Sequence, residues 1–371
     1  MESQTDSQTD RKGERVTAST KTKKTGKAGG GAKKTGKNLE LNFPDNKLVL
    51  ELFGAHHENL ARIEEKMGVV INARGNEVTV SGAPEAIKDA GRVLDGLYDR
   101  LTDGSPVSRE EVDAVLRMAA HPGGDIGDAG LTVHTRNRNI SPRSPIQADY
   151  LRAIDASALV FGEGPAGTGK TYLAVAKAVE RLVQGSVDRI ILSRPAVEAG
   201  EQLGFLPGDM REKVDPYLRP LYDALHDMLP VEQVELLMEK GEIEVAPLAF
   251  MRGRTLSNAF VILDEAQNTT AVQMKMFLTR LGNNSSMVIT GDLSQVDLPH
   301  GVRSGLRDAQ DTLDGVDGVA FITFSETDVV RHALVSRIVH AYKQAEDKSR
   351  AGDRYIKKQP APNKAGDDAG G

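Results

Sequence analysis

The feature that most constrains this chain is a glycine-rich loop between an apolar run and a helical pattern, Gly164-Pro165-Ala166-Gly167-Thr168-Gly169-Lys170-Thr171. Glycines let successive backbone N–H groups turn inward and form a cradle for an anion. The helix that follows adds unpaired N–H groups and the positive end of its dipole. Strand, loop and helix in this order predict a phosphate-binding loop in an α/β fold.

Residue types within and after the loop predict the ligands. Lys170 is expected to reach the β- and γ-phosphates of ATP, and the Thr171 hydroxyl is expected to ligate Mg²⁺. Tyr172 opens the helix and joins the predicted nucleotide-binding residues. The helix is expected to bury six side chains and to stop at Gly185. These side chains are Tyr172, Val175, Ala176, Val179, Leu182 and Val183.

Two later strand ends carry polar residues, as a hydrolytic site requires. Phe260–Leu263 is apolar and runs into Asp264 and Glu265. Asp264 is expected to hold Mg²⁺, directly or through water, and Glu265 to orient or deprotonate the attacking water. The run Met287–Thr290 leads to Gln295, a candidate for sensing the γ-phosphate.

Arginines could neutralise charge in the transition state, and five are candidates: Arg194, Arg252, Arg254, Arg331 and Arg337. Arg331 ranks first because it follows Ser325-Glu326-Thr327-Asp328, which resembles a capping box at a helix start. The predicted catalytic set is therefore Lys170, Glu265, Gln295 and Arg331.

Alternation of short apolar runs with helical patterns over residues 141–345 predicts a doubly wound, parallel α/β sheet. The predicted strands are Ala158–Gly162, Arg189–Ser193, Ala259–Leu263, Met287–Thr290 and Val319–Phe324. The segment Glu198–Met251 is expected to be a helical insertion that could serve as an oligomer or partner surface.

A small α+β domain is predicted over residues 40–102, with the order strand, helix, strand, strand, helix. Its expected elements are a strand at Leu48–Phe53, a helix at His57–Met67, strands at 69–71 and 78–80, and a helix at Ala83–Leu101. Residues 103–140 are expected to form a linker around a short helix at Arg109–Ala120.

Composition predicts a soluble, cytoplasmic protein with two tails. Residues 1–38 carry a net charge of +6 and almost no apolar residues, which predicts a disordered basic arm; residues 346–371 predict a second tail. The whole chain has a charge of −6, so the remainder carries −12. The absence of Cys excludes disulfides and thiolate sites, and no run approaches the roughly 18 apolar residues of a membrane helix.

The motifs together resemble those of PhoH-like proteins, over roughly residues 40 to 345. They comprise Gly164–Thr171, Ser193-Arg194-Pro195, Phe250–Thr255, Asp264–Asn268, Gly291–Gln295 and Asp328–His332. The resemblance implies a cytoplasmic ATPase related to the first core domain of superfamily-one helicases. It also implies that Gln147, in Ser144-Pro145-Ile146-Gln147, contacts adenine.

The N-terminal domain resembles a KH-like RNA-binding module, in which a G-x-x-G loop clamps nucleotides. The corresponding loop here is Gly54-Ala55-His56-His57, which lacks the second glycine and is followed by acidic residues, so a standard KH grip is not expected. Some PhoH-like proteins carry a nuclease module, but this domain is too short for one.

Two functions remain open from the sequence. The first is an ATPase acting on RNA or ribosome-associated substrates, and the second is a nucleotide-dependent switch or assembly factor that acts on protein partners. Directional unwinding is a third alternative, although the chain has room for a single core domain. The family resemblance implies a ring-shaped homo-oligomer, such as a hexamer, in which a neighbouring subunit could supply an arginine.

Overall fold

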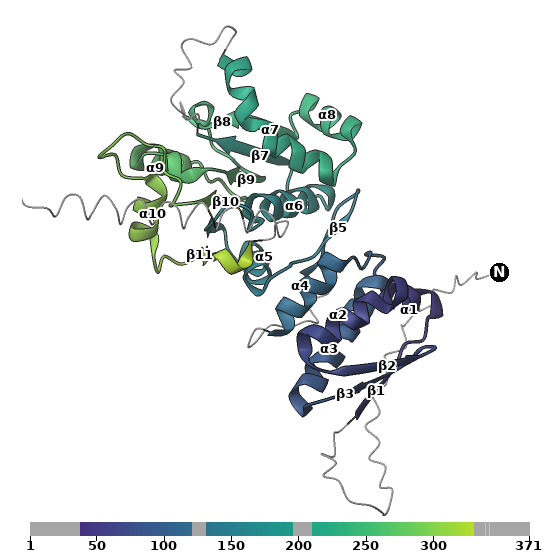
Figure 1. The fold of residues 1–371 in the computed structure, drawn as a ribbon. Coiled ribbons are helices and arrows are strands. Elements are labelled where there is room, and N and C mark those ends of the chain that lie inside the picture. Colours follow the sequence, from purple (N-terminus) through teal and green to yellow (C-terminus); the bar gives the residue numbers. More distant parts are fainter. Residues whose placement is uncertain (1–37, 121–130, 196–209, 330–337, 339–340, 342–371) are drawn as a thin grey trace, which may run out of the picture. The chain divides into compact units, whose positions relative to one another are not determined.

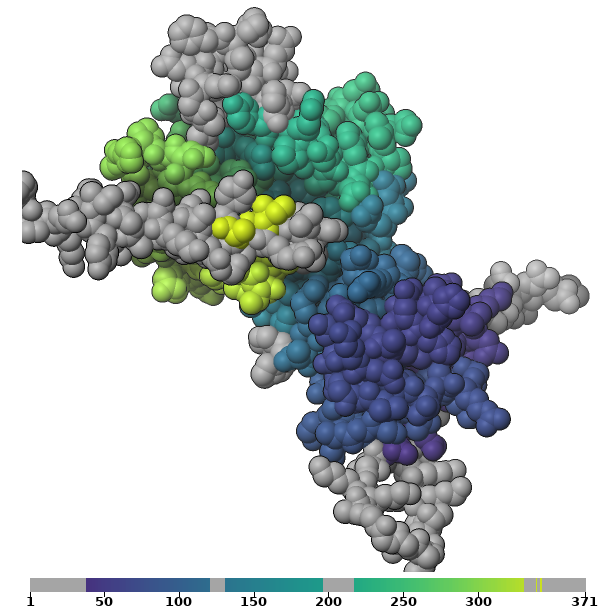
Figure 2. All heavy atoms as spheres, in the orientation of Figure 1, coloured from purple at the N-terminus to yellow at the C-terminus, as the bar shows by residue number. Residues whose placement is uncertain are grey.

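The computed structural model describes residues 38–120, 131–195, 210–329, 338 and 341, and side chains from 210 to 216 are not described. Two sheets with their own apolar cores dominate these residues (Figure 1). Side chains fill the spaces between the elements of each (Figure 2). Within the described ranges, no helix is long and apolar enough to cross a lipid bilayer.

The predicted small α+β module is confirmed, although the order of its elements differs. Its antiparallel sheet has three strands in the order β1-β3-β2. The elements are β1 (Asn38–Asn42), α1 (Asn46–Phe53), the short 3₁₀ helix η1 (Ala55–His57), α2 (Glu58–Met67), β2 (Val70–Arg74), β3 (Glu77–Ser81) and α3 (Pro84–Thr102). The helices α2 and α3 and the strand pair around Gly75 match the predictions.

The prediction of a strand at Leu48–Phe53 is wrong, because this segment is helix α1. Asp45 caps its start, with the carboxylate accepting a 2.8 Å hydrogen bond from Lys47 N. Val49, Leu52 and Phe53 are buried whereas Leu50 is 72% exposed, which is helical spacing. A mostly apolar run, interrupted only by Glu51, favoured a strand, but the pattern of burial follows the helical period.

Helix α4 (Arg109–Ala120) forms as predicted within the segment expected to be a linker. Its apolar side chains Val112, Val115 and Leu116 join the core of the N-terminal module. The same segment also contains a two-stranded ladder of β4 (Val133–His134) and β5 (Asn139–Ile140). The predicted linker is therefore structured at both of its described ends.

The larger sheet has six strands in the order β11-β6-β10-β9-β7-β8, and every neighbouring pair is parallel. Its strands are β6 (Leu159–Glu163), β7 (Arg189–Arg194), β8 (Ile243–Pro247), β9 (Ala259–Leu263), β10 (Ser286–Gly291) and β11 (Val319–Thr323). The five predicted strands are thus found within one residue or so of their predicted ends. Strand β8 was not predicted, and it lies in the segment expected to be a helical insertion.

Helices cover both faces of the six-stranded sheet, as in a doubly wound fold (Figure 1). The helices are α5 (Pro145–Ala156), α6 (Lys170–Val183), α7 (Met210–Met228), α8 (Val231–Glu239), α9 (Ala271–Leu278) and α10 (Gly305–Leu313), with short 3₁₀ helices η4 (Leu248–Met251), η5 (Ala266–Asn268) and η6 (Glu326–Asp328). On one face of the sheet, α5, α6, α7 and α8 pack against Val160, Leu192 and Ile262. On the other face, α9 and α10 pack against Phe161 and Val261.

The glycine-rich loop joins β6 to α6, so the predicted α/β fold with a phosphate loop is confirmed as a P-loop nucleoside triphosphatase core. Val175, Ala176 and Val179 of α6 are buried as predicted. The expected burial of Val183 is wrong, because this side chain is 44% exposed at the last turn. Gly185 ends the helix with a left-handed φ of 69°.

Candidate nucleotide site

The phosphate loop is shaped by three glycines with positive φ: Gly164 at 144°, Gly167 at 85° and Gly169 at 83°. Gly164 also has no room for a side chain, because a Cβ there would lie 2.5 Å from the carbonyl oxygen of Phe324. Gly169 precedes the first residue of α6 in a left-handed conformation. All three positions favour glycine for their conformation, and Gly164 also needs it for close approach of the backbone.

Lys170 folds its side chain back over the loop. Its Nζ donates to the carbonyl oxygens of Gly164 at 2.6 Å and Pro165 at 2.8 Å, and it lies 3.3 Å from Thr168 Oγ1. Thr168 Oγ1 in turn donates to Pro165 O at 2.9 Å. The ammonium group therefore lies in the concavity of the loop, where phosphate oxygens would be placed in a P-loop.

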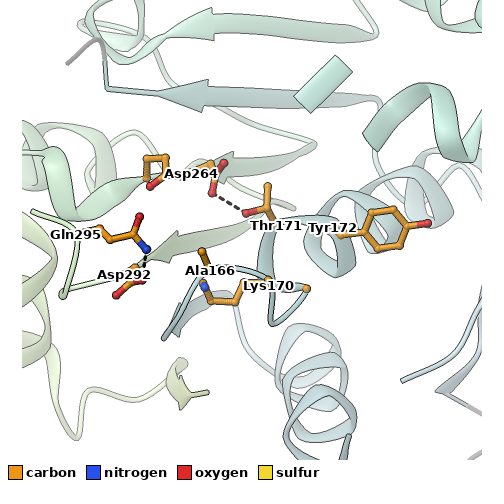
Figure 3. Close-up of a pocket in the computed structure, with 11 residues that line it drawn as sticks. Ala166, Lys170, Thr171, Tyr172, Asp264, Asp292 and Gln295 are labelled. Carbon is orange, nitrogen blue, oxygen red and sulfur yellow. Dashed lines mark hydrogen bonds between the residues drawn. The ribbon is translucent and has the colours of Figure 1, made fainter. Parts of the chain in front are cut away.

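Asp264 follows β9 and accepts four hydrogen bonds. Thr171 Oγ1 and Thr290 Oγ1 donate to Oδ1 at 2.7 and 2.6 Å. Arg194 Nε and Nη2 donate to Oδ2 at 2.8 and 2.5 Å. Its side chain is only 4% exposed, so the carboxylate charge is compensated entirely by these donors. The link to Thr171 joins the strand end directly to the phosphate loop (Figure 3).

Glu265, the next residue, has a different environment. Its side chain is 44% exposed, and its backbone adopts a left-handed φ of 54°. Gln267 Nε2 donates to Glu265 Oε2 at 2.6 Å, and Arg194 Nη2 lies 3.5 Å from Oε1. A left-handed backbone at a non-glycine residue costs about 1–3 kcal/mol and is typical of functional sites. The two neighbouring carboxylates thus differ: one is buried and saturated, and the other faces solvent.

Gln267 links the ends of β9 and β10, a role that the sequence did not reveal. Its Oε1 accepts from Asp292 N at 3.0 Å, and its Nε2 lies 3.3 Å from the backbone oxygen of Gln295. The predicted sensor Gln295 donates through Nε2 to Asp292 Oδ2 at 2.5 Å (Figure 3). Gln295 is therefore brought to the site, as expected, and is oriented by a carboxylate to which no role was assigned.

Gln147 is almost fully buried in α5 and contacts the phosphate loop. Its Nε2 donates to Thr168 O at 2.9 Å, and its Oε1 accepts from Arg143 N at 2.6 Å. Both ends of the amide thus bind backbone groups in this structure, and the adenine contact stays a prediction. The ring of Tyr172 points away from the labelled carboxylates (Figure 3), and its hydroxyl donates to Asp227 Oδ2 of α7 at 2.9 Å.

Beneath the site, Tyr150 of α5 packs against the backbone of Gly162 in β6. A Cβ at Gly162 would lie 2.9 Å from the Tyr150 ring, so glycine is required there. Burial, with a smaller effect of the Asp264 charge, raises the pKa of Tyr150 well above its ordinary value. The floor of the site is therefore shielded from solvent by Tyr150, and charges near it interact more strongly than in water.

The candidate arginines are placed very differently. Arg194 lies in the site, at Asp264. Arg254 forms two hydrogen bonds with Glu244, at 2.6 and 2.7 Å, and Arg252 is exposed at the end of η4. Arg331 and Arg337 lie outside the described residues. Upstream of them, Asp328 Oδ2 accepts from Ser325 N at 2.8 Å, which is one half of the predicted capping box.

The lining residues leave a cleft of about 250 Å³. It is lined by Ala166, Gly167, Gly169, Lys170, Thr171, Tyr172, Asp264, Glu265, Gly291, Asp292 and Gln295 (Figure 3). Thr171 Oγ1 and Asp264 offer hard oxygen donors, which suit Mg²⁺. Among the described residues, no cluster of three or more His, Asp or Glu side chains could hold a metal alone. The donor set therefore fits a Mg²⁺ ion that arrives with nucleotide phosphates.

Comparison with known proteins identifies the family of this chain. A family model described as "PhoH-like protein" matches residues 139–343. A PhoH-like protein of Bacillus subtilis is 51% identical over 309 residues, covering 82% of this chain and 96% of the relative. One from Mycobacterium tuberculosis is 52% identical over 303 residues (81% and 86%), and protein PhoH of Escherichia coli is 45% identical over 263 residues (70% and 72%). With the phosphate loop, the strand-end carboxylates and relatives matched over most of its length, this chain belongs to the PhoH-like protein family.

Proposed function

We propose that the protein is a Mg²⁺-dependent ATPase that acts on RNA or ribosome-associated substrates. The observation that carries the ATPase proposal is the pair of unlike carboxylates at the end of β9. Asp264 is buried and hydrogen bonded to Thr171, whereas Glu265 opens onto the cleft. One carboxylate is thus suited to the metal and the other to the attacking water.

In the proposed reaction, backbone N–H groups of the loop and Lys170 bind the β- and γ-phosphates. Thr171 and Asp264 would hold Mg²⁺, which would neutralise charge on the phosphate oxygens. Glu265 orients a water molecule for in-line attack and accepts its proton. Gln267 fixes the Glu265 carboxylate through its 2.6 Å hydrogen bond, and Gln295 reports the presence of the γ-phosphate.

The test is ATP hydrolysis by the purified chain, by two site variants and by one control variant. Glu265→Gln should bind ATP while turnover falls by about 100- to 10,000-fold, since a positioned general base contributes about that factor. Lys170→Ala should lose both binding and turnover. Arg303→Ala changes an exposed arginine paired with Asp308 and serves as the control. Normal turnover by Glu265→Gln would contradict the role given to this carboxylate.

The RNA part of the proposal is supported by the N-terminal module and the basic segment before it. The module has the element order β1-α1-α2-β2-β3-α3, and the loop compared with G-x-x-G joins α1 to α2. In this loop, His56 and His57 have left-handed φ values of 53° and 63°, which glycine would adopt without strain. The left-handed backbone that glycine favours is thus adopted in this loop by two histidines.

Measuring the ATPase rate with and without single-stranded RNA at low salt tests this part separately. Stimulation that falls as salt rises supports an RNA-linked ATPase. An ATPase that no RNA stimulates would favour the alternative, a nucleotide-dependent switch acting on protein partners. The acidic charge of the chain beyond residue 38 is the observation that favours this alternative.

The proposal includes a homo-oligomer, such as a hexameric ring, in which a neighbouring subunit supplies an arginine. It is supported by Arg254, because both ends of its guanidinium are hydrogen bonded to Glu244. Sedimentation velocity with ATPase assays at matched concentrations tests it. A monomer with the full ATPase rate would contradict the need for a second subunit.

A further inference from the structure

Arg194 joins two parts of the core, the residues that follow β9 and helix α7. Its Nε and Nη2 donate to Asp264 Oδ2, and its Nη2 also lies 3.5 Å from Glu265 Oε1. Its Nη1 donates to the backbone oxygen of Tyr217 in α7 at 2.8 Å. The side chain is 15% exposed, so these contacts are made largely out of water.

The hydrogen bonds at Asp264 use the full capacity of its carboxylate. An ionised carboxylate offers about four lone-pair sites. Thr171 and Thr290 occupy those of Oδ1, and the guanidinium of Arg194 supplies two N–H groups to Oδ2. A metal ion, or a water bound to it, can therefore reach this carboxylate only if one of these donors gives way.

Arg194 is the donor whose departure is favoured electrostatically. The threonine hydroxyls are neutral, whereas the guanidinium is a permanent cation within hydrogen-bonding distance of the carboxylate. A divalent cation entering between Thr171 and Asp264 would be repelled by it, and the low dielectric of the buried site strengthens that repulsion. Arg194 thus neutralises Asp264 before the metal arrives and opposes its arrival.

Helix α7 is the element that would respond to such a change. It is tied to the site twice, by Arg194 at Tyr217 and by Tyr172 at Asp227. Tyr172 directly follows the metal-site residue Thr171. Pro220 lies within α7 and lacks the N–H that would continue the helical hydrogen-bond ladder, which weakens the helix near Tyr217.

We propose that Arg194 is a latch: it holds Asp264 when magnesium–nucleotide is absent, and its release on loading is passed to α7 through Tyr217. The inference rests on the proposed function and assigns its regulation to a positioning residue. Arg194 acts on the reaction through Asp264 and α7. It thereby sets the magnesium concentration at which the site loads.

The first test measures binding of a fluorescent, hydrolysis-resistant ATP analogue to the full chain as Mg²⁺ is titrated. Arg194→Met, which keeps an unbranched apolar stem but removes the charge and the donors, should lower the half-saturating Mg²⁺ concentration by about tenfold. Arg194→Lys keeps the charge but not the two-point contact and should give an intermediate value. Arg280→Met is the matched control, because Arg280 binds two backbone carbonyls in the same core.

The outcomes separate the latch from the proposed function. An unchanged or raised Mg²⁺ midpoint in Arg194→Met overturns the latch, whereas a wild-type chain without Mg²⁺-dependent binding overturns the ATPase proposal as well. A purely structural role would lower the amount of bound analogue without lowering the midpoint. If Arg194→Met fails to fold, Arg194→Lys decides alone, and a midpoint equal to or above that of the wild type refutes the latch.

The second test follows α7 directly. The chain has no Cys, so Asp223→Cys, at an exposed position of α7, takes a single environment-sensitive label. Magnesium and the analogue should shift the emission of this label when Arg194 is present, and should not shift it when Arg194 is replaced with Met. The emission of a label at Val316→Cys, a 45% exposed position between α10 and β11, should stay unchanged. An equal shift at Asp223→Cys with and without Arg194 would refute the connection to α7.

Discussion

Replacing Asp95 with Asn should stabilise the protein near neutral pH and leave its stability unchanged in acid. Asp95 lies in α3, and its Oδ1 is buried without a hydrogen-bond partner among the described residues. Burial, with a smaller effect of the Asp99 charge one turn away, raises its pKa to about 6. The folded protein therefore holds this proton more tightly than the unfolded chain does.

The sign and size of the effect follow from this difference. A raised carboxyl pKa gives stability that is present at low pH and is lost as the pH rises from about 4 through about 6. A shift of about two pKa units corresponds to about 3 kcal/mol. Because Asp95 is only partly buried, screening by solvent reduces the expected gain for Asp95→Asn to about 1 kcal/mol.

Urea unfolding followed by far-ultraviolet circular dichroism measures the gain. At about pH 8 the midpoint for Asp95→Asn should rise by about 0.5 M, for a urea dependence near 2 kcal/mol/M, and at about pH 4 the two proteins should coincide. Asp89→Asn alters an aspartate on the same helix that pairs with Arg92, and it should show no such gain. Equal differences at both pH values, or destabilisation at about pH 8, would refute the reasoning.

Two further substitutions test the geometry of the nucleotide site. Gly164→Ala should lower the free energy of unfolding by more than about 2 kcal/mol and weaken ATP binding, because its Cβ would lie 2.5 Å from Phe324 O. As a control, Gly241→Ala replaces a left-handed glycine that has open space around it, and thermal unfolding should show a loss of only about 1 kcal/mol. Gln267→Ala should lower kcat by about tenfold with little change in ATP affinity, because Glu265 loses its 2.6 Å hydrogen bond; a normal kcat would exclude this orienting role.

The site could be predicted in large part because its residues follow buried apolar strands. Asp264 comes directly after β9, and the carboxyl ends of parallel strands meet at one edge of the sheet. The contacts of Arg194 and Gln267 could not be predicted, since each depends on how neighbouring strands and α7 lie in space. The sequence motifs that contain Arg194 and Gln267 could be recognised, but the spacing of residues in a motif does not indicate which group each side chain binds.

Fold predictions failed where local signals compete. The apolar run at Leu48–Phe53 fits a strand, and only the Asp45 cap and the exposure of Leu50 reveal the helical period. Strand β8 escaped detection because Ile243–Pro247 is short and contains a glutamate and a proline. Such residues are tolerated because β8 is an edge strand of the sheet, and edge position is a property of the tertiary fold.

The left-handed backbone of Glu265 implies a trade-off between chemistry and conformational preference. Glycine would adopt a φ of 54° without the penalty of about 1–3 kcal/mol that a glutamate pays, so Glu265→Gly should yield a better-relaxed but inactive protein. A screen for thermal stability alone would therefore select against the proposed catalytic base. Variants recovered at this position report whether stability or turnover was under selection.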